Sequence, residues 1–226
     1  MDWLLFLIVG AFAGLLAGLF GVGGGAIIVP ILILIFSQQG FEAGLLTHLA
    51  IGTSFAIIVV TSFGSVSAHH RLGNVNWLVV KSMAPGLIVG VVLGAVIATE
   101  LAGRHLQLAI AVFLMLVAVQ MFFALQPRAL FGLPRRSVLV SSGVVIGGAS
   151  AFFGIGGGSL TVPFLAACNQ VMKRAVATSS ACGFPIAVFG ALAYGVKGLS
   201  VSGLPSLATG YIYWPAFVGI AIASIP

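Results

Sequence analysis

The feature that most constrains this chain is a glycine-rich break that occurs twice, each time inside a long apolar run. The first copy, Phe20-Gly-Val-Gly-Gly-Gly-Ala-Ile-Ile-Val-Pro30, interrupts a run that extends from Trp3 to Phe36. The second copy, Phe153-Gly-Ile-Gly-Gly-Gly-Ser-Leu-Thr-Val-Pro163, follows 133 positions later and repeats every glycine and the proline. Helix packing alone can explain one such break. Two breaks in register indicate a duplicated transporter with a binding site at the breaks.

The composition makes the lipid bilayer the solvent of this protein. Of its 226 residues 61% are hydrophobic and only 5% are charged. Soluble domains carry about a quarter charged residues, so this chain has too few to cover a surface that faces water. Its basic residues stand singly or in pairs between the apolar runs. That placement is typical of residues that orient a membrane protein, and it does not indicate nucleic-acid binding.

The apolar runs predict an all-α polytopic membrane protein in two halves. Residues 1–126 form the first repeat, 127–136 a connecting loop, and 137–226 a second repeat that lacks a counterpart of the helix at 106–125. The chain is therefore expected to be truncated at its C-terminal end. The predicted helices cover residues 3–20, 26–36, 45–67, 77–99, 106–125, 137–153, 159–168, 175–196 and 210–226. Polar segments at 37–42, 69–74, 100–105, 169–174 and 197–205 are predicted to be loops.

Two details of the runs refine this prediction. The segment 26–36 is too short to cross about 30 Å of hydrocarbon at 1.5 Å per residue. Pro85-Gly86 predicts a kink in the helix at 77–99, and the spacing of Gly90 and Gly94 predicts a close helix contact.

The two halves also match after the breaks. The segment Thr47 to Ser54 aligns with Met172 to Ser179, which places Thr53-Ser54 opposite Thr178-Ser179. His48 falls opposite Lys173 in this alignment. The hydroxyl groups are expected either to contact a ligand or to bond to their own helix turns. His48 is either a substrate contact or an interfacial residue, and Lys173 and Arg174 are expected to anchor the topology.

The basic residues favour an inverted relation between the halves. If each broken run crosses the membrane once, the nine Lys and Arg divide six to three between the two sides. If each run folds back as a hairpin, seven share one side and only Arg104 and Lys197 lie on the other. The second division obeys the positive-inside rule better. It predicts two inverted repeats, an external N-terminus and a cytoplasmic loop at 126–136.

The breaks have the chemistry of a small-anion site. A helix that starts directly after such a break directs unpaired N–H groups and the positive end of its dipole into it. The three acidic residues Asp2, Glu42 and Glu100 all lie at ends or in loops, which favours anions over metal ions and argues against proton coupling through a buried carboxylate. The predicted substrate-binding residues are Gly23, Gly24, Gly25, Gly156, Gly157, Gly158, Ser159, Thr53, Ser54, Thr178, Ser179 and His48.

The duplicated Phe-Gly-[Val/Ile]-Gly-Gly-Gly element, with a Thr-Ser pair at the start of each following helix, resembles the sulfite exporter TauE/SafE family. The resemblance covers essentially the whole chain. It implies a multi-pass permease of the bacterial inner membrane for sulfite, sulfoacetate or another small sulfur-containing organic anion. It does not identify the anion or the direction of transport.

The sequence therefore predicts a secondary carrier that works by alternating access around the breaks. An anion channel, or an assembly factor that transports nothing, remains an alternative. No nucleophile–base pair, metal cluster or acid pair is evident, so we do not expect an enzyme, a metal or a cofactor. The expected partners are the small anion and the lipid bilayer.

Overall fold

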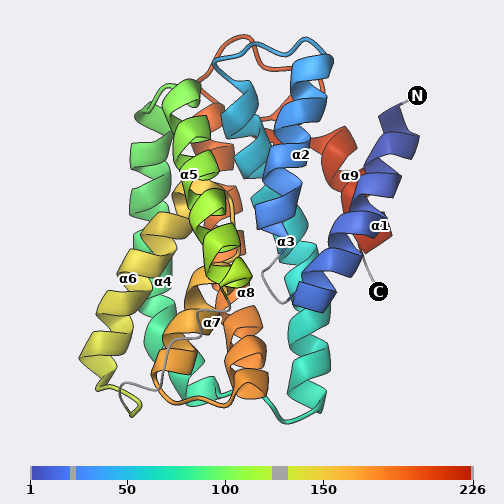
Figure 1. Ribbon diagram of the computed structural model, residues 1–226. Helices are drawn as coiled ribbons and strands as arrows, with labels where there is room; N and C mark the ends of the chain where they lie inside the picture. Colours follow the sequence, from blue (N-terminus) through green and yellow to red (C-terminus); the bar gives the residue numbers. More distant parts are fainter. Residues whose placement is uncertain (1, 21–23, 124–131, 225–226) are drawn as a thin grey trace.

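The computed structural model describes residues 2–20, 24–123 and 132–224, and these residues are nearly all helical (Figure 1). The helices are α1 (Asp2–Phe20), α2 (Gly25–Gln38), α3 (Leu46–Arg71), α4 (Trp77–Glu100), α5 (Gly103–Phe122), α6 (Arg136–Phe153), α7 (Gly158–Ala167), α8 (Met172–Gly198) and α9 (Trp214–Ser224). The strands β1 (Ala208–Thr209) and β2 (Ile212–Tyr213) pair antiparallel before α9. The prediction of an all-α fold is confirmed apart from this short hairpin.

Several helices extend further than the apolar runs predicted. Helix α3 continues to Arg71, so His69 and His70 form its last turn and the prediction of a loop there was wrong. Basic side chains complement the negative end of a helix dipole, which favours this longer end. Helix α8 begins at Met172 and therefore includes Lys173, whose long side chain can reach past the apolar region. Likewise α2 runs to Gln38, whereas α9 begins only at Trp214.

Five helices of the described part are long and apolar enough to cross a membrane. They are α3, α4, α5, α6 and α8. Helices α2, α7 and α9 are apolar but shorter. The chain is therefore a multi-pass membrane protein with partial-length helices among its spans.

Both glycine-broken runs fold back on themselves. In Figure 1, α1 descends and α2 returns upward, whereas α6 ascends and α7 returns downward. The two hairpins thus enter the bundle from opposite ends. Four helix ends lie together at the bottom of the view. They are the end of α3, with Arg71, and the starts of α4, α6 and α8, of which α4 carries Lys81 and α6 carries Arg136. Arg128, which was predicted to share this end, is outside the described residues.

Glycines let the helices pack backbone to backbone. A methyl group at Gly90 of α4 would overlap the carbonyl oxygen of Val144 in α6, and one at Gly147 of α6 would overlap that of Leu87 in α4. This confirms the close contact predicted from the glycine spacing in α4. Because lipid is as apolar as these helices, close van der Waals packing is what holds such a pair together.

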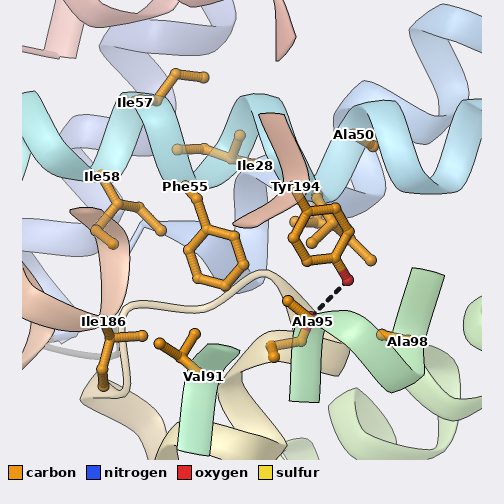
Figure 2. Close-up of a cluster of buried hydrophobic side chains, with 14 of the residues drawn as sticks. Ile28, Ala50, Phe55, Ile57, Ile58, Val91, Ala95, Ala98, Ile186 and Tyr194 are labelled. Atoms are coloured by element: carbon orange, nitrogen blue, oxygen red, sulfur yellow. Dashed lines mark hydrogen bonds between the residues drawn. The ribbon is translucent and has the colours of Figure 1, made fainter. Parts of the chain in front are cut away.

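The core lies mainly among α2, α3, α4 and α8. Figure 2 shows Phe55 and Tyr194 side by side among buried aliphatic residues, and their ring centroids are 5.9 Å apart. A methyl group at Gly190 would lie 2.9 Å from the ring of Phe55, so this glycine gives the ring its space. The buried Tyr194 hydroxyl donates a 2.8 Å hydrogen bond to the carbonyl of Ala151 in the last turn of α6. This bond ties α8 to the turn that precedes the second glycine break.

Candidate functional site

The start of α2 meets the second glycine break inside the bundle. Helix α2 begins at Gly25, and a methyl group there would overlap the carbonyl oxygen of Gly154 and lie 2.9 Å from Cα of Ile155. Only a glycine permits this approach. Gly23, which was predicted to belong to the site, lies outside the described residues, as do its two predecessors. The structure therefore brings Gly25 into direct contact with the second break.

The second break owes its shape to left-handed glycines. Gly154 (φ 65°) ends α6 and Gly157 (φ 76°) precedes the first residue of α7, and both conformations are strained for residues with a side chain. Gly156 between them is buried, and α8 approaches it at Gly183, where a methyl group would lie 2.6 Å from the Gly156 carbonyl oxygen. The break is thus enclosed by protein rather than exposed to lipid.

Helices α2 and α7 both begin at this junction. The Gly24 carbonyl accepts the first intrahelical bonds of α2, at 3.1 and 2.9 Å, and the Gly157 carbonyl accepts those of α7, at 3.1 and 2.7 Å. The amides of Gly25 and Gly158 come before these bonds and point out of the helix ends. The positive ends of two helix dipoles therefore converge on the breaks. Ser159, at the second position of α7, is half-buried.

The two threonines of the Thr-Ser pairs each hold the start of a distant helix. Thr53 Oγ1 in α3 accepts a 3.0 Å hydrogen bond from the amide of Tyr213, directly before α9. Thr178 Oγ1 in α8 accepts a 3.0 Å bond from the amide of Asn76, directly before α4. Each threonine thus binds backbone of the opposite half of the chain, and neither donor comes from the threonine's own helix turn.

The two serines of these pairs differ. Ser54 Oγ donates a 2.9 Å hydrogen bond to the carbonyl of Gly154, so α3 holds the second break in place. Ser179, its counterpart, is 1% exposed, and its hydroxyl has no hydrogen-bond partner. Of the four hydroxyl groups in the two Thr-Ser pairs, three are therefore engaged with backbone in this structure.

The structure does not direct His48 toward the breaks. Its ring nitrogens Nδ1 and Nε2 each lie 3.3 Å from a carbonyl oxygen, of Gly44 and of Ala98 respectively. The ring stacks on Tyr211 with 5.2 Å between centroids. Burial, and secondarily the charge of Glu100, raise the pKa of Tyr211, which favours its neutral form. His48 thus belongs to a contact between α3, the end of α4 and the hairpin before α9.

Two further hydroxyl groups beside the second break were missed by sequence reasoning. Ser150 and Thr161 are both 0% exposed, and neither hydroxyl oxygen has a hydrogen-bond partner. Both lie close to Gly157. The signal was present in the repeat, because these are positions at which the two copies differ: the first copy has Ala17 and Ile28 there.

A pocket of about 190 Å³ lies elsewhere, at the end of the bundle where α2 meets α3. Its lining includes Phe41, Glu42 and Gly203. The carboxylate of Glu42 would repel an anion. The breaks, rather than this pocket, remain the better candidate for an anion site.

The apolar spans and the paired broken helices define a polytopic membrane transporter. The family model for the sulfite exporter TauE/SafE matches residues 6–226, and the chain belongs to this family. A probable membrane transporter protein of Haemophilus influenzae is 38% identical over 224 residues, which cover 98% of this chain and 84% of the relative. One of Methanocaldococcus jannaschii is 32% identical over 225 residues, which cover 98% and 79%. No solved structure matches the chain significantly.

Proposed function

We propose that this protein is a secondary carrier for a small oxyanion, and that the junction of the two glycine breaks is its midplane binding site. The observation that carries the proposal is the contact of Gly25 with Gly154, because it brings the amino-terminal ends of α2 and α7 to one junction. Each break lies between a partial-length helix and its hairpin partner. Broken helices that meet inside a bundle are the usual construction of substrate sites in carriers.

The contacts of matching residues support inverted repeats. Gly10 and Gly14 of α1 match Gly143 and Gly147 of α6 in the repeat. The first pair packs on α9, with a methyl group at Gly10 falling 2.7 Å from the carbonyl oxygen of Ile220. The second pair packs in the same way on α4. The pair of α1 and α9 therefore corresponds to the pair of α6 and α4 when the halves are exchanged. The matching helices α3 and α8 pack on each other.

Chemistry favours an anion as the ligand. Two helix amino-terminal ends supply N–H donors and positive partial charge. The acidic residues Glu42 and Glu100 lie at the ends of the bundle, far from where a cation site at the breaks would need them. The family name and these donors together support sulfite, sulfoacetate or another small sulfur-containing anion as the substrate class.

Alternating access explains the close contact of the breaks better than a channel does. The first residues of α2 touch the second break backbone to backbone, which leaves no continuous passage at that point. Movement of one repeat relative to the other would open the junction to one side at a time. By the positive-inside rule, the end of the bundle that is rich in basic residues faces the cytoplasm. In a bacterial cell, we place the protein in the inner membrane.

The test is thermal unfolding of the purified, full-length protein with sulfite, thiosulfate, sulfate, sulfoacetate, taurine or lactate. A ligand at 100 times its Kd stabilises the folded state by about 2.7 kcal/mol, enough to shift the midpoint visibly. We expect a sulfur anion to stabilise the protein and Gly157→Leu to abolish both the shift and transport. Failure of every anion to stabilise would contradict the proposal.

The matched control is Gly64→Leu. Gly64 lies in α3 with no atom near the position of an added Cβ, so this change should leave folding and transport intact. Gly24→Leu at the first break should behave like Gly157→Leu. If both break variants remain folded and transport normally, the breaks are not the site.

A further inference from the structure

The two breaks differ in a way that a symmetric site does not explain. Ser150 in the last turn of α6 and Thr161 in the first turns of α7 carry hydroxyl groups that are buried and without a hydrogen-bond partner. Burying an unpaired hydroxyl group is unfavourable. At the matching positions the first copy has Ala17 and Ile28, and Ile28 is part of the apolar core. The repeat can therefore be built with hydrocarbon at both places.

The two hydroxyl groups converge beside Gly157. The position that a Cβ would take on Gly157 lies 3.3 Å from Thr161 Oγ1 and 3.7 Å from Ser150 Oγ. Gly157 adopts φ 76° and caps α7, so the amide of Gly158 and the positive end of the helix lie next to it. Two hydroxyl donors, one helix end and a glycine without a side chain thus surround one point.

We propose that Ser150 and Thr161, with the amino-terminal end of α7, bind the transported oxyanion, so that the side-chain contacts to the anion come from the second half alone. This inference rests on the proposed function. Each hydroxyl group would donate to an oxygen of the anion, and the helix end would add backbone N–H groups. Lys and Arg side chains in the described part lie near helix ends, so binding relies on neutral donors that also permit release.

The same geometry assigns different tasks to the hydroxyl groups. Thr53, Ser54 and Thr178 are already bonded to backbone of the opposite half and hold the two halves together. The hydroxyl groups of Ser150 and Thr161, which lie beside Gly157, have no such bond, and Ser179 in α8 carries a further unpartnered hydroxyl group. The side chain of Ile186 in α8 covers this point, since its Cδ1 is 2.6 Å from the Cβ position at Gly157. Rotation of this flexible side chain would admit the ligand.

The experiment compares wild type with Ser150→Ala, Thr161→Val and the double variant in purified, full-length protein. Sulfite, added as a sodium-free salt, is the probe, and both thermal unfolding and binding affinity are measured. Neither hydroxyl group makes a bond in the free protein, so the variants should unfold at the same temperature as wild type or higher. We expect sulfite affinity to fall about tenfold for each hydroxyl group removed.

The matched control is Ser141→Ala, which removes an exposed hydroxyl group of α6 that bonds only to the carbonyl of Val138. It should bind sulfite like wild type. If wild type binds and transports sulfite and the double variant binds it within about twofold of wild type, the site is wrong and the proposed function stands. If wild type neither binds nor transports sulfite or sulfoacetate, both the proposed function and this binding site are wrong. Stabilisation by sodium ions that the double variant loses would identify a cation site and overturn the proposal.

Discussion

Replacing Ser54 by alanine removes the hydrogen bond that joins α3 to the second glycine break. The Ser54 hydroxyl is buried and lies 2.9 Å from the Gly154 carbonyl oxygen, which would then lose this donor. The matching change, Ser179→Ala, deletes the same atoms from a hydroxyl group that has no partner. The two substitutions occupy equivalent places in the repeat, so a purely sequence-based argument would give them equal effects.

The structure predicts unequal effects. Losing a hydrogen bond costs about 0.5–1.5 kcal/mol, and leaving a buried acceptor unsatisfied raises the cost to about 1–3 kcal/mol. Hydrogen bonds between membrane helices fall toward the lower end, so we expect Ser54→Ala to cost about 1–2 kcal/mol. For a chain of 150–250 residues this lowers the unfolding midpoint by about 2–8 °C. Ser179→Ala should cost nothing or raise the midpoint slightly, because no bond is lost.

The assay is thermal unfolding of both variants in the same detergent, followed by retention of the monodisperse peak in size-exclusion chromatography. The difference between the variants matters more than either shift alone, since the detergent affects both. Equal destabilisation, or a larger loss for Ser179→Ala than for Ser54→Ala, would refute the assignment of the cross-half bond.

Three further predictions follow from the contacts of particular residues. Gly147→Ala places a methyl group on a backbone carbonyl of α4 and should destabilise the protein by about 1–3 kcal/mol in thermal unfolding, whereas Gly148→Ala, with 3.7 Å to its nearest neighbour, should be tolerated. Gly25→Ala should reduce sulfite transport in liposomes at least tenfold by forcing the breaks apart, whereas Gly64→Ala should transport normally; equal rates would contradict this. Cys182 is 0% exposed and should react with a maleimide only after unfolding; rapid labelling of native protein would show that α8 is misplaced.

Much of the fold could be predicted from the sequence because the chain contains two copies of the same element. The repeated glycines located both breaks, and the basic residues favoured hairpins over single crossings. The helix ends at Arg71 and Lys173 were misjudged because a hydropathy pattern ends where charge begins, whereas long basic side chains let a helix continue into the interface.

The site was only partly predictable. A site at the two breaks was predicted, but the contact of Gly25 with Gly154 was not. The cross-half bonds of Thr53 and Thr178 join residues more than a hundred positions apart, and local sequence carries no signal for them. Ser150 and Thr161 do not belong to the shared motif, because the first copy has Ala17 and Ile28 at these positions.

The most direct test of the central claim is sulfite counterflow in liposomes that contain the purified, full-length protein. Radiolabelled sulfite is supplied outside, with or without unlabelled sulfite trapped inside. A carrier with one site that opens alternately to each side predicts saturable uptake that trapped sulfite accelerates, and loss of that uptake in the Gly25→Ala protein. Uptake that does not saturate and ignores trapped sulfite, or that equals the uptake of protein-free liposomes, would contradict the account.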